Sequence, residues 1–188
     1  MPALHRRYVV LSLALVVITS ACGDSYAPSE LGRFTAEIAG GLDRDLDGQA
    51  EFRDDVLSSG LGNAFLLAQY DDADRLVHSI SLYRWSDQPI VPGTYRVIAG
   101  GEPGMTDDDF LAALLLDATG IAGPSSCIAE GGSVRIAFAS ERRVEGTFEL
   151  TGRCGMESRP PAAPFEAEGS FTAIPGDFGP PYILRDAD

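Results

Sequence analysis

The segment SVRIAFASERRVEGTFELT, at residues 133–151, decides the fold class. Apolar and polar residues alternate on both sides of the charged turn at 140–143, which is the period of two of a half-buried strand. A Pro-rich stretch at 159–164 leads into a third alternating run, residues 165–173. Three such runs predict an antiparallel meander with one face on the core and one in solvent.

Shorter alternating runs, separated by Gly, Pro, Asp and Ser, precede this meander at 34–38, 64–70, 77–83 and 94–98. Residues 106–117 fit either a helix capped at Thr106 or a buried strand, and the strand matches the spacing of its neighbours better. We therefore expect an all-β domain at 32–175. Its architecture would be a single antiparallel β-sandwich or an up-and-down β-barrel of about eight or nine strands.

The cysteines support this register independently. If Ala139 lies opposite Val144, an unbroken antiparallel ladder places Cys127 and Cys154 almost opposite each other. Disulfide bonds need this proximity, so the sequence predicts a Cys127–Cys154 bridge. The alternative is a pair of free core thiols.

The N-terminus has the layout of an export signal. A basic start at 5–7 precedes an apolar run at 8–18, which is too short for a comfortable membrane span, and then small residues lead to Cys22. The stretch ITSAC at 18–22 resembles the lipobox of bacterial lipoproteins. The alternative is an ordinary secretory signal that is cut near Ala21.

The lipobox resemblance implies removal of residues 1–21, lipidation of Cys22, and a polar tether at 22–31 that holds the β domain on a membrane of the bacterial cell envelope. Residues 176–188 are expected to form a C-terminal tail. The turn at Pro89–Tyr95 and the strands after it resemble, in style only, small β-sandwich lipoproteins of unknown function. That second resemblance brings no functional residues with it.

The charge of the chain excludes one class of partner. The formal net charge is −14, and the chain contains no lysine. Such a chain repels phosphate backbones and anionic lipid heads, so we expect no nucleic-acid partner and membrane contact only through the lipid. Hydrophobic residues make up 45% of the chain, which predicts a folded domain rather than disorder.

One acidic segment has the spacing of a calcium-binding loop. DRDLDGQAEFRD, at residues 43–54, fits the D-x-D-x-D-G pattern of an EF-hand with an acid at the twelfth position. The expected calcium ligands are Asp43, Asp45, Asp47, Gln49 and Asp54. The alternative is an acidic hairpin with Asp47 and Gly48 in its turn, because the flanking residues look like strands rather than helices.

Few residues suggest catalysis. His78 lies on an apparently apolar strand face and is expected to be structural. Tyr83 and Trp85 share a strand face near Tyr95, a pattern that is more typical of packing than of a sugar site. The sequence therefore predicts a non-enzymatic envelope module that binds another envelope protein or a small ligand. The alternatives are a calcium-binding surface protein and a glycan hydrolase that uses paired carboxylates.

Overall fold

The computed structural model describes residues 31–40, 43–54, 62–86, 88–100, 102–119, 125–156, 159–176 and 178. The expected signal peptide, Cys22 and nearly all of the expected tether and C-terminal tail lie outside these residues. The described part forms β-strands and no helix, which confirms the all-β prediction. The strands are β1 (Arg33–Gly40), β2 (Arg44–Arg53), β3 (Asn63–Tyr70), β4 (Leu76–Arg84), β5 (Gly93–Ile98), β6 (Phe110–Leu116), β7 (Ser125–Ser140), β8 (Arg143–Met156) and β9 (Arg159–Pro175).

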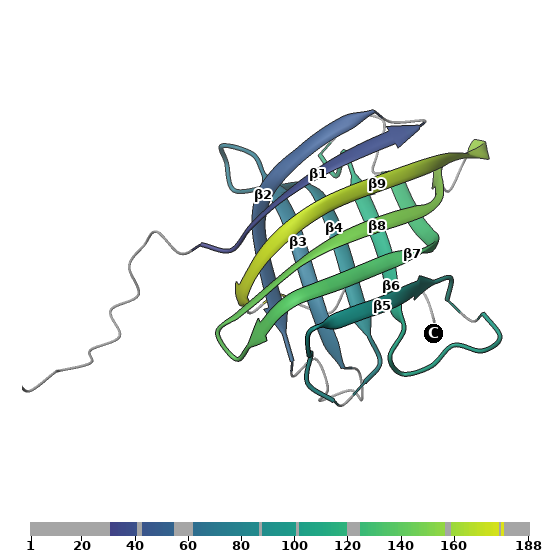
Figure 1. Cartoon of the computed structure of the whole chain (residues 1–188). Helices are drawn as coiled ribbons and strands as arrows, with labels where there is room; N and C mark the ends of the chain where they lie inside the picture. The colour runs from purple at the N-terminus through teal and green to yellow at the C-terminus, as the bar shows by residue number, and fades with distance from the viewer. Residues whose placement is uncertain are drawn as a thin grey trace, which may run out of the picture.

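These strands close into a barrel in the order β1-β2-β3-β4-β6-β5-β7-β8-β9, and β9 pairs antiparallel with β1 to complete it. Figure 1 shows β1, β9, β8 and β7 side by side across the front, with β2, β3, β4 and β6 behind them. Closure leaves neither β1 nor β9 as an unpaired edge.

The barrel differs from the expected up-and-down topology at β5 and β6, which exchange places. β6 pairs antiparallel with β4, and β5 pairs antiparallel with β7. The end of β5 lies beside the start of β6, and the two strands run parallel. They share a single residue pair, Val97 with Phe110. The strand prediction for the 106–117 segment is confirmed, since Phe110–Leu116 forms β6.

The meander of β7, β8 and β9 is confirmed, including the register of its first turn. Ala139 lies opposite Val144, and Cys127 lies opposite Cys154 and is joined to it by a disulfide bond. The two cysteines miss direct opposition by two residues in an unbroken ladder. Two irregularities in the β7–β8 pairing, next to Ala129 and Ile136, absorb this difference.

Alternate residues of every strand fill the barrel with apolar side chains. The largest fully buried ones are Phe65, Phe110, Phe148, Phe165, Ile38, Leu67, Ile80, Leu82, Leu114, Leu116, Leu150 and Val97. This packing accounts for the alternation seen in strands such as β1, where only one side meets the core. Strands β3, β4 and β6 are buried on both sides, and Ala64, Tyr83, Ile98 and Leu111 form a second, smaller apolar cluster.

Several phenylalanine rings in the barrel lie over a glycine on the neighbouring strand. The directly opposed pairs are Phe34 with Gly48, Gly146 with Phe171, Phe148 with Gly169, and Gly152 with Phe165. A Cβ atom added to any of these glycines would come within 3 Å of the opposing ring. Each ring therefore uses the space that the missing side chain leaves, and this pairing pins the register of four strands.

Candidate functional site

Four carboxylates form a row across the outer face of the front strands. Asp45 of β2 lies directly opposite Glu37 of β1, Glu37 lies opposite Glu168 of β9, and Glu168 lies opposite Glu149 of β8. We call these four residues the acidic row. All four are exposed, and no described residue forms an ion pair with any of them. Directly opposed side chains lie about 5 Å apart at Cβ, so like charges in such a row repel each other.

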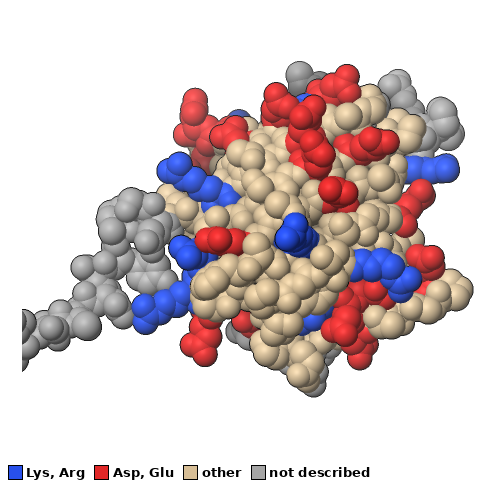
Figure 2. Space-filling view, in the orientation of Figure 1, with Lys and Arg blue, Asp and Glu red and all other residues tan. Residues whose placement is uncertain are grey.

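The acidic row lines a surface hollow of about 630 Å³. Asp47 adds a fifth carboxylate, and the hydroxyl groups of Thr35, Thr147 and Ser170 lie beside the row. A smaller adjoining hollow of about 380 Å³ adds Glu166. In Figure 2, acidic side chains gather over the upper part of the face on which β1 and β9 lie. The outer face of these strands is therefore both concave and negative.

This arrangement suits binding rather than acid–base catalysis. The carboxylates stand on one face of a single sheet and project in the same direction. They do not face each other from opposite walls of a cleft, as a glycosidase pair does across the scissile bond. A row of negative charges with neighbouring hydroxyl groups matches an extended cationic ligand.

The expected calcium ligands do not converge on one point, because residues 44–53 form strand β2 instead of a loop. Asp43 accepts a hydrogen bond from the Gly40 amide at one end (3.0 Å), and Asp54 accepts one from the Asn63 side chain at the other (3.1 Å). Eleven residues of extended chain span about 35 Å, far beyond the reach of one ion. Asp45, Asp47 and Gln49 alternate along β2, and the first two line the hollow. The alternative hairpin is also wrong, since Asp47 and Gly48 lie within β2.

Neutralising one member of the acidic row should stabilise the fold. Glu168→Gln is expected to raise the free energy of unfolding by about 0.5 kcal/mol at low salt, because Glu168 lies between Glu37 and Glu149. Urea denaturation measures this change, and the gain should shrink at high salt as screening increases. The control Glu141→Gln, in the exposed turn between β7 and β8, should leave stability unchanged. A loss of stability in Glu168→Gln would show that this carboxylate has a favourable partner.

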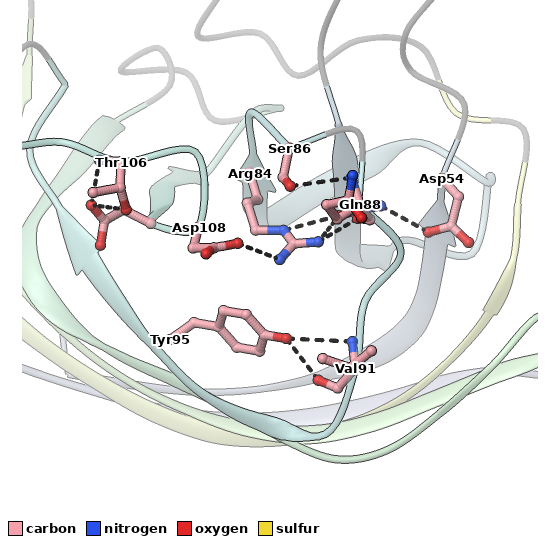
Figure 3. Close-up of polar contacts among 10 residues, drawn as sticks. Asp54, Arg84, Ser86, Gln88, Val91, Tyr95, Thr106 and Asp108 are labelled. Carbon is pink, nitrogen blue, oxygen red and sulfur yellow. Dashed lines mark hydrogen bonds and ion pairs between the residues drawn. The ribbon is translucent and has the colours of Figure 1, made fainter.

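A second polar cluster fills the seam where β5 and β6 barely pair, and Figure 3 shows it in close-up. Arg84 is only 2% exposed and lies at its centre. Its guanidinium group donates to Asn63 Oδ1, the Gln88 carbonyl and Asp108 Oδ1, and it lies over the Tyr95 ring at 5.3 Å. Arg84 thus connects β3, β4, β5 and the segment before β6, which indicates a structural role for this cluster.

The loop before β6 is fixed by a carboxylate that is 5% exposed. Asp109 accepts hydrogen bonds from the Thr106 amide and hydroxyl and from Arg96 on β5. The hydrogen bonds from Arg96 lower the pKa of Asp109 to about 2. Thr106 and Asp109 therefore close a turn that leads into β6, whereas their spacing also fitted the cap of a helix.

The remaining sequence candidates are structural in the barrel. Tyr83 and Trp85 share a face, as predicted, with ring centroids 6.2 Å apart, but Tyr83 packs with Ala64 and Leu111. Burial raises the pKa of Tyr83 to about 12. Tyr95 does not join them, because its ring lies against Phe110 and Arg84.

Comparison of the chain with protein family models, with curated proteins and with solved structures finds no match. Within the described residues, no helix has the length and apolar character needed to cross a membrane.

Proposed function

We propose that this protein is a lipid-anchored module of the bacterial cell envelope whose barrel binds a cationic partner on the face that carries the acidic row. The observation that carries the binding role is the direct opposition of Asp45, Glu37, Glu168 and Glu149 across four strands. The lipidation of Cys22 rests on the lipobox resemblance.

The acidic row lowers the stability of the sheet, and the fold itself does not require carboxylates at these exposed positions. Like charges directly opposite each other destabilise a sheet, and the outer face of a strand accommodates many neutral side chains equally well. Because the row lines a hollow, an extended cationic ligand that lies along it would face several carboxylates at once. Such a ligand would remove the repulsion among them when it binds.

The anchor is tested by the intact mass of the protein purified from membranes of a bacterial host. We expect a chain that starts at Cys22 and carries the added mass of lipid, and we expect Cys22→Ala to lose both the lipid and the membrane association. A wild-type chain that starts at Cys22 without added mass would contradict the anchor, while leaving the binding face untouched.

The binding face is tested with an oligo-arginine peptide as the cationic probe. We expect the wild-type protein to bind it and Glu37→Gln/Glu168→Gln to bind at least tenfold more weakly. We also expect the wild-type affinity to fall as salt rises. The control Glu102→Gln/Glu141→Gln changes the net charge by the same amount outside the row. Equal weakening by both variants would show general charge attraction and contradict a specific face.

Calcium is the alternative occupant, because Asp45 and Asp47 line the hollow beside Glu37. Among the described residues, no group of three His, Cys, Asp or Glu side chains is placed to hold one metal ion. Calorimetry with calcium chloride separates the two ligands. Heat at millimolar calcium that disappears in Asp45→Asn/Asp47→Asn would favour the metal over the cationic partner.

A further inference from the structure

His78 closes the opposite end of the barrel from Arg84. Both residues lie on β4 and point inward with Ile80 and Leu82, so β4 has an apolar middle and a cationic or titratable residue at each end. His78 is 7% exposed. Its ring meets Arg44 of β2 and Asp117, which directly follows β6. We call these three residues the His78 latch.

The imidazole ring of His78 lies between two groups that can only donate hydrogen bonds. The backbone amide of Asp117 donates to Nδ1 at 3.1 Å, and the Arg44 Nη1 atom lies 3.3 Å from Nε2. Because Nδ1 accepts, the proton of the neutral ring is on Nε2. Nε2 therefore carries an N–H group in both protonation states, and its approach to Arg44 is not a hydrogen bond in either of them. Protonation adds an N–H group on Nδ1, which would then meet the N–H group of the Asp117 amide. The neutral ring is therefore the form that fits this site.

The same contacts hold the end of β6 against β4 and β2. Arg44 makes two hydrogen bonds to the Asp117 carboxylate, at 2.8 and 2.7 Å. The next amide, that of Ala118, donates to the Val77 carbonyl at 2.9 Å. Asp117 adopts a left-handed backbone conformation with φ of 55°, which costs free energy in a non-glycine residue. The turn at Asp117 and Ala118 is thus a strained segment kept in place by the latch.

We propose that the His78 latch is sensitive to acid: protonation of His78 releases the turn at Asp117 and Ala118 and opens this end of the barrel. The event adds one proton to Nδ1 of the ring, breaks the hydrogen bond from the Asp117 amide, and places a second positive charge beside Arg44. This inference does not depend on the proposed binding face, because the latch and the acidic row share no residue.

The charged groups that face the ring have opposite effects on it. Burial lowers the pKa of His78 below its usual 6.5, Arg44 lowers it further, and Asp117 raises it. The cross-strand neighbour of His78 on β3 is Gln69, which does not titrate. Since the two lowering effects outweigh the carboxylate, the closed barrel favours a neutral ring.

The sign of the pH dependence follows from this lowered pKa. Above pH 6.5 the ring is neutral in both the closed and the open form, and the latch contributes its full stability. As pH falls from 6.5 towards the lower pKa of the closed form, only the open form takes up a proton. Opening should therefore become easier by up to about tenfold per pH unit across this window, and no further below it.

The acid sensitivity of the His78 latch is tested in the purified protein by two measurements. An NMR titration of the assigned His78 ring should give a pKa below 6.5, with the neutral ring protonated on Nε2. Hydrogen exchange of the Asp117 and Ala118 amides, corrected for the intrinsic effect of pH, should accelerate by up to about tenfold per unit below pH 6.5. Amides in the middle of β8 should not change.

Two variants distinguish a pH-dependent role of His78 from a purely structural one. His78→Asn keeps an acceptor near the position of Nδ1 and does not titrate, so its Asp117 and Ala118 amides should lose the extra acceleration. Arg44→Met should raise the pKa of His78. A wild-type pKa at or above 6.5 would overturn the proposal even if neither variant folds. The same conclusion would follow from equal acceleration in wild type and His78→Asn.

Discussion

Arg84→Met is expected to lower the free energy of unfolding by about 4 kcal/mol, the largest effect among the substitutions considered. Arg84 is 2% exposed, and its guanidinium group donates two hydrogen bonds to Asn63 Oδ1, at 3.0 and 2.6 Å. Methionine keeps an unbranched apolar stem but lacks the guanidinium group and has no donors. It would leave Asn63 Oδ1 and the Gln88 carbonyl without the hydrogen bonds that Arg84 gives them. Urea denaturation, followed by the fluorescence of Trp85, measures the loss.

The matched control is the ion-pair partner of Arg84. Asp108→Asn removes a carboxylate that lies 3.2 Å from Nη1 but whose side chain is 75% exposed. We expect it to cost less than about 1 kcal/mol, because solvent screens such a pair and the remaining contacts of Arg84 stay in place. Equal costs in the two variants would mean that the ion pair, rather than the hydrogen bonds across the seam, holds Arg84.

The burial of Arg84 can be predicted from the sequence, but only some of its contacts can. The alternation of His78, Ile80 and Leu82 assigns an inward face to β4, and Arg84 continues it. A charged residue on an inward face is a signal for a buried polar cluster. Two of its partners are local, since Asn63 lies opposite Arg84 in the neighbouring strand β3 and Gln88 follows four residues later. The sequence could not supply Tyr95 and Asp108, because their positions depend on the exchange of β5 and β6. That exchange leaves a seam where backbone ladder bonds are nearly absent, and the side chains of the cluster fill it.

The acidic row illustrates the same division between local and long-range information. Alternation along each strand predicts that Glu149 and Glu168 point to solvent, and the meander brings these two together. Glu37 joins them only because β1 pairs with β9 at the closure of the barrel. Closure joins the two ends of the domain, and no local pattern encodes their register. The sequence therefore predicts the strands of the acidic row but not the row itself.

The calcium-loop pattern of residues 43–54 also occurs in a strand, and here the segment forms β2. Its spacing matches a chelating loop, but alternate acids along a strand have the same spacing when they all face solvent. Leu46, Ala50 and Phe52, which alternate with the polar residues, point into the core, and their burial is the feature that distinguishes a strand from a chelating loop. The disulfide was predictable because Cys127 and Cys154 lie in neighbouring strands joined by a short turn, where local counting suffices.

Gly169→Ala is expected to destabilise the barrel by about 3 kcal/mol, although it adds a single methyl group. A Cβ atom at this position would lie 2.5 Å from Phe148 Cζ and would also clash with the Thr35 carbonyl of β1. The ring could shift only by displacing its own neighbours in a packed core, and the carbonyl belongs to the β1–β9 ladder. Thermal or urea denaturation measures the loss.

The matched control for Gly169 is Gly155→Ala on β8, where an added Cβ would have no atom within 4 Å. We expect this variant to be within about 0.5 kcal/mol of wild type. Phe148→Leu in the Gly169→Ala background should recover part of the loss, because the ring that occupies the glycine's space is gone. A favourable coupling in this double-mutant cycle would show that ring and glycine are one packing unit. Additive losses would mean that Gly169 is required only by the backbone of β1, and that the Phe–Gly pairs do not set the register.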